Sequence, residues 1–163
     1  MKRIFLIRHA KSSWKDSSLR DIERPLKKKK KSDTVLIGGA LREKYPRPDV
    51  FISSPAKRAK KTAKKIAKEI GYDGKILVLP ELYDFDLHSY YSAIEQINDK
   101  YDSVFLFGHN PVISETAMDV TGEYFGEMPT CAVYVADIQT SKWSEVTPGC
   151  AVKVDYISPK MYK

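Results

Sequence analysis

The sequence predicts an α/β protein: a three-layer α/β/α sandwich with a mostly parallel sheet and antiparallel C-terminal edge strands. In the first two thirds of the chain, short apolar runs alternate with helical patterns of about 10–18 residues, which is typical of βαβ units. In the last third, segments rich in β-branched residues are separated by a turn, which favours antiparallel strands. The chain has 163 residues and no linker-like stretch, so we expect one domain over residues 1–163.

The predicted strands differ in pattern between the two parts of the chain. The parallel strands are continuous apolar runs, as expected for strands that are buried on both faces of a sheet. They are expected at residues 2–7, 49–53, 76–79 and 103–107. The antiparallel strands are expected at residues 130–138, 142–146 and 150–157, with the turn Thr147-Pro148-Gly149 before the last of them.

The clearest helix is predicted over residues 55–70. Ser54 is expected to be its N-cap and Pro55 its first residue, where the missing N–H of proline costs nothing. Gly71 is expected to end it. Apolar residues recur at helical spacing and predict the buried face, which consists of Ala59, Ala63, Ile66, Ala67 and Ile70.

A second helix is predicted over residues 111–121. Here Asn110 is the expected N-cap, Pro111 the first residue and Gly122 the stop signal. A further helical pattern covers residues 87–97.

The net charge favours anionic partners without naming them. Lysine and arginine total 28, aspartate and glutamate total 21, and the formal net charge is +7. The Lys27–Lys31 run and the lysine face of the helix at 55–70 are either solvated charge or a surface that steers an acidic phosphoprotein. We do not expect nucleic acid as a partner, because no aromatic residues interleave with the run.

The sequence predicts neither a membrane-spanning helix nor a secretory signal peptide. The apolar runs are far shorter than the roughly 18 residues that a membrane helix needs, or the roughly 7–15 of a signal peptide. Cys131 and Cys150 are the only two cysteines and have no CxxC spacing, so we expect neither a disulfide scaffold nor a thiolate zinc site. The expected location is cytoplasmic, with both thiols reduced.

Two of the three histidines directly follow predicted parallel strands. His9 comes after the first strand and His109 after the fourth. Ligands of open α/β sheets bind beyond the carboxyl ends of the strands, so both side chains are expected in one region. Arg8 accompanies His9, and Arg58 lies in the first turn of the helix that the second strand feeds. His88 has no such context and is expected to be a surface or capping residue.

This set of side chains favours phosphate chemistry. Arginine binds phosphate with a planar fork, and helix N-termini add N–H donors and a favourable dipole. A neutral imidazole is a competent nucleophile toward phosphorus, and neighbouring arginines disfavour the protonation of His9. Two histidines without a third ligand or a carboxylate cluster make a poor metal site, so we expect none.

Three ordered motifs resemble the histidine phosphatase superfamily, which has the phosphoglycerate mutase-like fold. They are Leu6-Ile7-Arg8-His9-Ala10, the segment 53–63 (SSPAKRAKKTA) and Gly108-His109-Asn110-Pro111. Arg24-Pro25-Leu26 resembles the short SixA-type phosphohistidine phosphatases. So does the C-terminal part, with Pro129-Thr130, Trp143, Pro148-Gly149 and Ser158-Pro159-Lys160. The resemblance covers nearly the whole chain.

The resemblance implies a role for each matching position. His9 would be the nucleophile that forms a phosphohistidine intermediate, and Arg8 and Arg58 would clamp the phosphoryl oxygens. His109 would stabilise the transition state. Ser12 and Asn110 are weaker pocket candidates. No metal or cofactor is implied, and phosphate or sulfate is expected to bind between the two arginines and the two histidines.

Two departures from the family pattern stand out. Ala10 replaces the usual glycine, which suggests slightly less room for the backbone. After Arg24-Pro25-Leu26, Lys27 and Lys30 replace a threonine and a glycine, which argues against a pocket role for this turn.

The general acid is the open question of the predicted mechanism. Glu81 matches the position at which branches that cleave phosphate esters place an acid, whereas imidazole leaves phosphorus far more easily than an alkoxide does. The leading hypothesis is a metal-independent phosphatase acting on protein phosphohistidine. The alternatives are a small-molecule phosphomonoesterase or mutase that uses Glu81, and a non-catalytic basic binding module. Because only about 16 residues separate the helix at 55–70 from the next helical pattern, the large cap of other members is expected to be mostly missing, which leaves an open site suited to a protein substrate.

Overall fold

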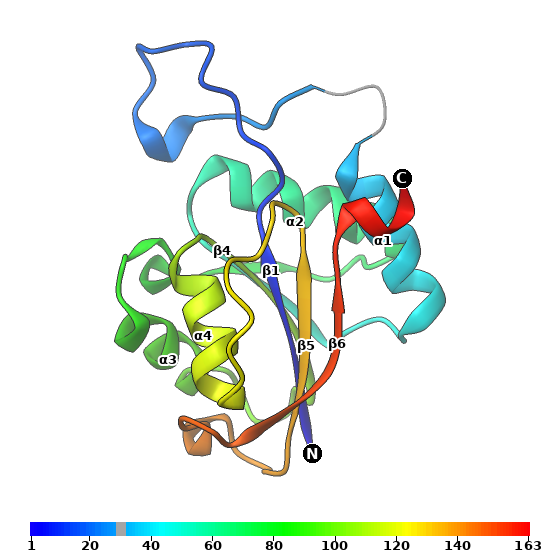
Figure 1. Ribbon diagram of the computed structural model, residues 1–163, viewed down its shortest axis with the longest axis vertical. Helices are drawn as coiled ribbons and strands as arrows, with labels where there is room; N and C mark the ends of the chain where they lie inside the picture. The colour runs from blue at the N-terminus through cyan, green and yellow to red at the C-terminus, as the bar shows by residue number, and fades with distance from the viewer. Residues whose placement is uncertain (29–31) are drawn as a thin grey trace.

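A computed structural model describes residues 1–28 and 32–163 (Figure 1). The strands form one six-stranded sheet in the order β3-β2-β4-β1-β5-β6. Neighbours among β3, β2, β4 and β1 pair in parallel, whereas β5 pairs antiparallel with both β1 and β6. The strands are β1 (Lys2–Arg8), β2 (Val50–Ser53), β3 (Ile76–Val78), β4 (Ser103–Gly108), β5 (Val133–Ile138) and β6 (Ala151–Ile157).

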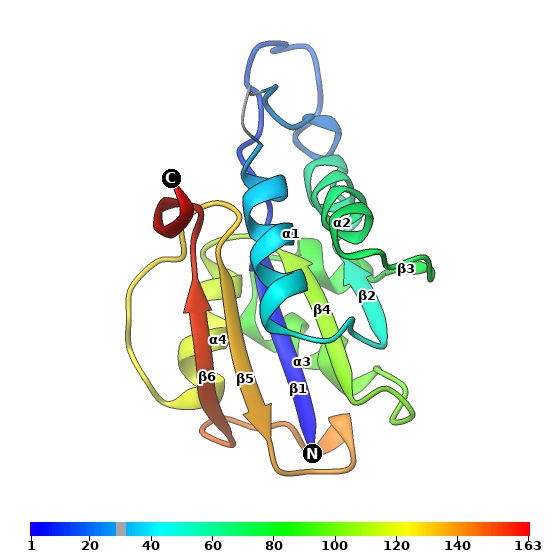
Figure 2. The same ribbon diagram turned by 90° about the vertical axis from the view of Figure 1, so that its right-hand side faces the viewer.

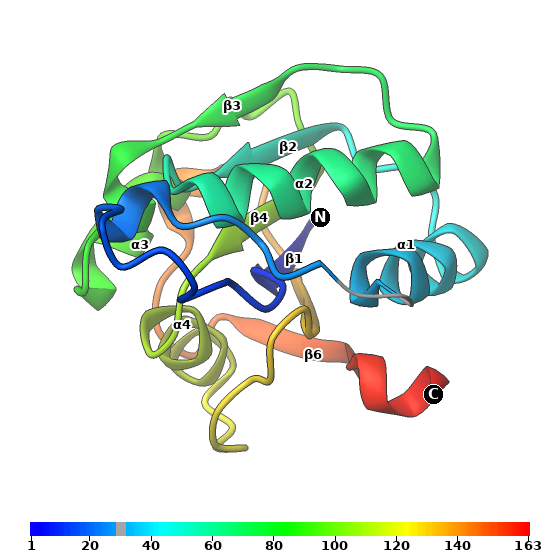
Figure 3. The same ribbon diagram turned by 90° about the horizontal axis from the view of Figure 1, so that it is seen from above.

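Helices cover both faces of the sheet (Figures 2 and 3). On one face lie α1 (Asp33–Lys44) and α2 (Lys57–Ile70), and on the other lie α3 (Leu87–Glu95) and α4 (Val112–Thr121). Four short 3-10 helices are η1 (Asp21–Glu23), η2 (Pro80–Tyr83), η3 (Trp143–Glu145) and η4 (Pro159–Tyr162). The three-layer sandwich, with its mostly parallel sheet and antiparallel C-terminal strands, is therefore confirmed.

The continuous apolar runs are explained by the two helical layers. In β1, Ile4 and Leu6 pack into the core under α3 and α4, whereas Phe5 and Ile7 pack into the core under α1 and α2. All four side chains are at most 1% exposed. Burial of each side chain of this size contributes roughly 1.5–3 kcal/mol, so the strand is held from both faces.

Three local expectations are wrong, each because tertiary contacts override a local pattern. The helix α2 begins at Lys57 after the N-cap Ala56, so Ser54 is not its cap. The N-cap of α4 is Pro111 rather than Asn110. Residues 142–146 form no strand. The indole of Trp143 is fully buried there and donates to the backbone oxygen of Tyr101, and this anchoring produces the 3-10 turn η3.

The two expected stop signals are confirmed. Gly71 and Gly122 end α2 and α4 with φ values of 74° and 73°, in the left-handed region that glycine adopts without strain. In the described residues 1–28 and 32–163, no helix is long and apolar enough to span a membrane.

Candidate active site

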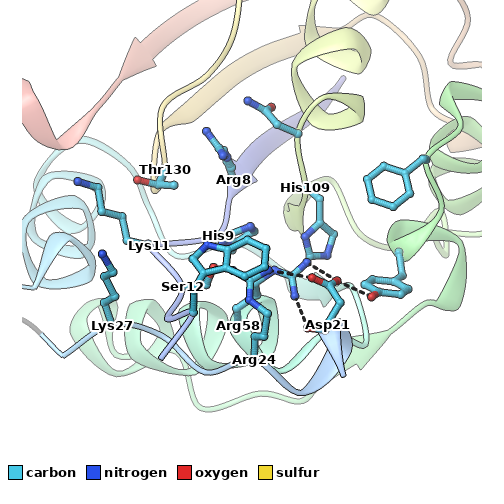
Figure 4. A pocket seen from close by; sticks show the side chains of 14 residues that line it. Arg8, His9, Lys11, Ser12, Asp21, Arg24, Lys27, Arg58, His109 and Thr130 are labelled. Carbon is cyan, nitrogen blue, oxygen red and sulfur yellow. Dashed lines mark hydrogen bonds and ion pairs between the residues drawn. The ribbon is translucent and has the colours of Figure 1, made fainter. Parts of the chain in front are cut away.

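The carboxyl ends of three adjacent strands form the floor of the site. In the sheet, β4 lies between β1 and β2, and Arg8 pairs with Gly108 in the register of β1 and β4. His9 and His109 each follow one residue later, and their ring centroids are 5.1 Å apart. The two histidines, 100 positions apart in sequence, therefore meet at one edge of the sheet, as predicted (Figure 4).

A cavity of about 590 Å³ opens above this floor. The four predicted site residues Arg8, His9, Arg58 and His109 all line it, and so do the weaker candidates Ser12 and Asn110. Eight further residues complete the lining: Lys11, Trp14, Asp21, Arg24, Lys27, Tyr83, Phe85 and Thr130.

His9 is held in one tautomer. Its Nδ1 lies 2.6 Å from the backbone oxygen of Ala10, and a carbonyl oxygen can only accept a hydrogen bond, so Nδ1 carries the proton. In the neutral ring the lone pair is then on Nε2. Ala10 is itself fixed, because its N–H donates to Oγ1 of Thr62 on α2 at 3.0 Å. Backbone and helix together thus leave Nε2 of His9 as the ring atom with a free lone pair.

His109 is positioned through both its ring and its backbone. Its Nε2 lies 2.7 Å from Oγ of Ser54, and its backbone N–H donates to the hydroxyl of Tyr90 at 2.9 Å. Its Nδ1 is buried and has no hydrogen-bond partner among the described residues. Gly108 is required here, since a Cβ at this position would lie 2.5 Å from the Tyr90 hydroxyl.

Both histidines are neutral well below neutral pH. Burial is the main cause that lowers the pKa of His9 to about 4, and the charges of Arg58, Arg8 and Arg24 lower it further. Burial also dominates at His109, where it and the proximity of His9 and Arg58 lower the pKa to about 3. His9 therefore keeps the lone pair of Nε2 across the physiological pH range.

These two pKa values predict a loss of stability in mild acid. The unfolded histidines titrate near 6.5, so between pH 6.5 and about 4 the unfolded chain binds protons that the native state does not. The stabilising contribution is complete above pH 6.5 and falls with pH through this window. The expected loss from pH 7 to pH 5 is about 2 kcal/mol for each histidine.

Urea unfolding at pH 7 and pH 5 in phosphate-free buffer measures this effect. The double variant His9→Asn/His109→Gln should lose most of the pH dependence, and His88→Asn, which changes an exposed histidine on α3, should keep it. An equal acid loss in the double variant would contradict the prediction.

Arg58 and Arg24 share one carboxylate. Arg58 donates from Nη1 to the backbone oxygen of Asp21 at 2.7 Å and from Nη2 to Oδ2 of Asp21 at 2.9 Å. Arg24 donates to Oδ1 at 2.8 Å, and the hydroxyl of Tyr83 donates to Oδ2 at 2.6 Å. Both guanidinium side chains are at most 8% exposed. This network holds the arginine forks in place beside the histidines (Figure 4).

The carboxylate of Asp21 stays ionised in this network. Burial opposes its ionisation, but the hydrogen bonds from Tyr83, Arg24 and Arg58 outweigh burial and hold the pKa of Asp21 well below its usual range. Asp21 therefore accepts hydrogen bonds and does not carry a proton to donate.

Arg8 and Asn110 are anchored on a common carbonyl. The backbone oxygen of Met128 accepts from Nη1 of Arg8 at 2.8 Å and from Nδ2 of Asn110 at 2.9 Å. The Oδ1 of Asn110 accepts from the hydroxyl of Ser114. Nε of Arg8 is buried and unpaired within the described part of the chain. Asn110 thus fixes the loop that holds Arg8, while Arg8 keeps a donor free.

The turn at residues 24–27 contributes to the site, contrary to expectation. Arg24 and Lys27 line the cavity, and Arg24 also donates to the hydroxyl of Ser12. Residues 29–31 of the lysine run lie outside the described residues. Glu81 does not line the cavity, although it belongs to η2 next to Tyr83; its Oε2 is buried without a partner among the residues described.

Four residues that hold the site together are not predicted from the sequence. Asp21, Tyr83 and Tyr90 have no motif at their positions, and Ser54 is expected only as a helix cap. Two signals were available: Ser54 lies in the segment 53–63 that resembles the superfamily, and Arg24, which binds Asp21, lies in a segment that resembles the SixA-type proteins.

Comparison with known proteins agrees with this geometry. The family model described as "Histidine phosphatase superfamily (branch 1)" matches residues 4–103. The chain belongs to this superfamily. A solved structure of a candidate phosphohistidine phosphatase SixA from Agrobacterium tumefaciens is 26% identical, with a TM-score of 0.81 over 97% of this chain and 98% of that one.

Other relatives extend the comparison. A structure of the protein histidine phosphatase SixA complexed with tungstate has a TM-score of 0.83 at 21% identity, over 99% of both chains, which shows the shared fold. An uncharacterised Mycobacterium tuberculosis (strain H37Rv) protein is 28% identical over 94% of this chain and 100% of its own length. The chain is thus a SixA-type member of the superfamily, and the family and the site together support a phosphatase.

Proposed function

We propose that this protein is a metal-independent phosphatase that removes phosphate from phosphohistidine on other proteins. The reaction would proceed through a covalent phosphohistidine at His9. Nε2 of His9 attacks phosphorus and the P–N bond of the substrate breaks. The electron pair of that bond leaves with the substrate imidazole, which departs as a neutral ring because its other nitrogen carries a proton. Water then attacks phosphorus, the P–Nε2 bond breaks, and inorganic phosphate and free His9 result.

The arginines and His109 would carry the developing charge. Arg8 offers Nε, which has no partner among the described residues, and Arg58 lines the cavity with a side chain that is 7% exposed. Donors that are fixed in advance in a buried site stabilise a transition state more than mobile ones do. A SixA structure of the same fold is complexed with tungstate, a tetrahedral oxyanion, which supports phosphate or sulfate as a ligand of this protein. We expect that anion in the cavity between the arginines and the histidines.

The observation that carries the choice of substrate is the state of Asp21. It is the one carboxylate that lines the cavity in the described part of the chain, and its hydrogen bonds keep it ionised. Cleavage of a phosphate ester needs an acid to protonate a strongly basic alkoxide. An imidazole is a much weaker base, with an ordinary pKa near 6.5, and leaves phosphorus without a carboxylic acid. The site therefore favours phosphohistidine over a phosphate ester.

The mouth of the cavity supports a protein as the carrier of that phosphohistidine. Trp14 is 73% exposed and Phe85 is 75% exposed, and both line the cavity at its rim. No helix of the described residues lies between α2 and η2 to cap the opening. Exposed aromatic side chains of this kind are typical of surfaces that contact a macromolecule.

A competition between substrates tests the proposal. The enzyme would be given a histidine-phosphorylated protein domain beside phosphoserine and sugar phosphates, with EDTA present throughout. We expect kcat/KM for the phosphoprotein to exceed that for every ester. Faster turnover of the sugar phosphates would refute the choice of substrate, and a loss of activity with EDTA would refute metal independence.

The ester-cleaving alternative makes a different prediction for Glu81. If Glu81 were the general acid, Glu81→Gln would abolish ester hydrolysis and leave phosphate binding intact. Because Glu81 lies outside the cavity lining, we expect Glu81→Gln to change kcat/KM for phosphohistidine by less than about two-fold. Parallel assays on phosphohistidine and on phosphoserine, whose alkoxide leaving group needs an acid, separate the two mechanisms.

A further inference from the structure

A second cavity, of about 540 Å³, adjoins the candidate active site on the outer side of α2. Its walls carry lysines from α2 and apolar side chains from the segment that contains η1. We call it the lysine groove; it is lined by Leu19, Ile22, Glu23, Pro55, Lys57, Lys60, Lys61 and Lys64.

We call the cavity of the candidate active site the catalytic cavity. The lysine groove and the catalytic cavity share two walls, which are η1 and the first turns of α2. From η1, Asp21 faces the catalytic cavity, and the next two residues, Ile22 and Glu23, face the groove. From α2, Arg58 faces the catalytic cavity, while Lys57 beside it faces the groove. Figure 3 shows η1 at the N-terminal end of α2. A protein whose phosphohistidine enters the catalytic cavity would therefore lie close to the groove.

The charge of the groove is one-sided. Four lysines line it against one acid, Glu23, whose carboxylate already accepts hydrogen bonds from the backbone and the side chain of Arg20. Lys57, Lys61 and Lys64 are exposed. Positive potential collected in a concave surface attracts anionic partners and raises their rate of association.

The same lysines are unfavourable for the helix that bears them. The first turn of α2 contains no acidic residue and begins with Lys57, although the N-terminus of a helix favours negative charge. Lys57, Lys61 and Lys64 recur at spacings of four and three, where like charges repel one another. An acidic partner bound in the groove would relieve both effects, because its negative charges would lie close to the lysines and to the N-terminus of α2.

The groove also contains apolar side chains, which favour a partner with aliphatic residues. Leu19, Ile22 and Pro55 are each partly exposed and offer contacts to aliphatic side chains. From Lys57 to Lys64 the helix rises about 10 Å, at 1.5 Å per residue. The groove thus matches about two turns of a partner helix that carries acids on one side and aliphatic residues between them.

We propose that the lysine groove docks an acidic segment of the substrate protein, with aliphatic residues among its acids, and so brings the phosphohistidine into the adjoining cavity. This docking rests on the proposed function. It assigns specificity to residues that do not touch the phosphoryl group, so it affects protein substrates and leaves a small phosphohistidine substrate unchanged.

Three substrates and two variants test the docking. The substrates are free phosphohistidine, a peptide with one phosphohistidine among glutamates and leucines, and the same peptide with glutamine for each glutamate. The variant Lys57→Gln/Lys61→Gln/Lys64→Gln removes charge from the groove. The matched control Lys75→Gln/Lys100→Gln/Lys142→Gln removes three exposed lysines that do not line the groove.

We expect the groove variant to lose about ten-fold in kcat/KM on the acidic peptide at low salt, through KM. Its activity on free phosphohistidine should stay unchanged, which also shows that it is folded. The control variant should lose less than about two-fold, and salt should weaken the wild-type preference for the acidic peptide.

The other outcomes separate the two proposals. A wild type that hydrolyses none of the three substrates overturns the proposed function and the docking with it. A wild type that hydrolyses free phosphohistidine but treats both peptides alike, or a groove variant that loses activity equally on both, overturns the docking alone. Stronger inhibition by a short poly(U) RNA than by the unphosphorylated acidic peptide would assign the groove to RNA and overturn the docking.

Discussion

Replacement of His9 by asparagine is expected to lower kcat on a phosphohistidine substrate by about 10⁴-fold or more. The nucleophilic Nε2 is removed, and loss of a nucleophile in other covalent enzymes costs up to about 10⁶-fold. The side-chain amide of asparagine can still donate to the backbone oxygen of Ala10, as Nδ1 of His9 does, so the cavity should keep its shape. Tungstate should therefore bind to the variant within a few-fold of the wild-type affinity.

Trapping of the phosphoenzyme makes this test specific. Wild-type protein exposed to labelled phosphohistidine should carry an acid-labile label on His9, and the variant should carry none. His88→Asn is the matched control, since His88 is exposed and lines neither the catalytic cavity nor the lysine groove. Full labelling of the His9 variant, or its normal turnover, would exclude His9 as the nucleophile. Absence of both turnover and label in the wild type as well as in the variant would instead favour the non-catalytic binding module.

Replacement of Arg58 by glutamine is expected to lower kcat/KM by about 10²–10³-fold. Removal of one preorganised donor to a transition-state oxyanion typically costs this much. Arg58 has a second task here, because it supplies two of the hydrogen bonds that hold Asp21. Its loss would leave that carboxylate with Arg24 and Tyr83 alone, and should also weaken the binding of tungstate.

A lysine at the same position separates charge from geometry. Arg58→Lys keeps the positive charge but not the planar fork, so we expect it to recover only a small part of the lost kcat/KM. Arg47→Gln is the control, since its guanidinium is exposed and donates to the backbone oxygen of Gly71. Kinetics on free phosphohistidine, with tungstate binding by calorimetry, measure both effects. Recovery of wild-type activity by Arg58→Lys would show that only the charge matters.

The sequence predicted the parts of the site that depend on local pattern. An apolar run followed by a polar residue marks the end of a buried strand, and this placed His9 and His109 at the same edge of the sheet. The segment at 53–63 placed Arg58 near the start of a helix. Both predictions depend on residues that are close in the chain, because these residues determine where a strand ends and which face of a helix a side chain occupies.

The residues that the patterns missed act across long sequence distances. Asp21 meets Arg58 from 37 positions away, and Tyr90 fixes the backbone of His109 from 19 positions away. Ser54 combines a local and a distant contact. Its hydroxyl accepts from the backbone N–H of Ala56 just before α2, and it also pairs with His109, 55 positions further along the chain. Only the local contact could be expected from the sequence around Ser54.

The local order of apolar and polar residues alone predicts the α/β class. It also predicts that two histidines and two arginines lie at the carboxyl edge of the sheet. The strand order that inserts β4 between β1 and β2, the tautomer of His9, the low pKa values of both histidines and the ion pairs of Asp21 depend on the folded chain. Burial and hydrogen-bond partners set protonation and orientation, and both come from segments distant in sequence. The residue types at the site can therefore be predicted from local sequence, whereas their protonation and orientation depend on the fold.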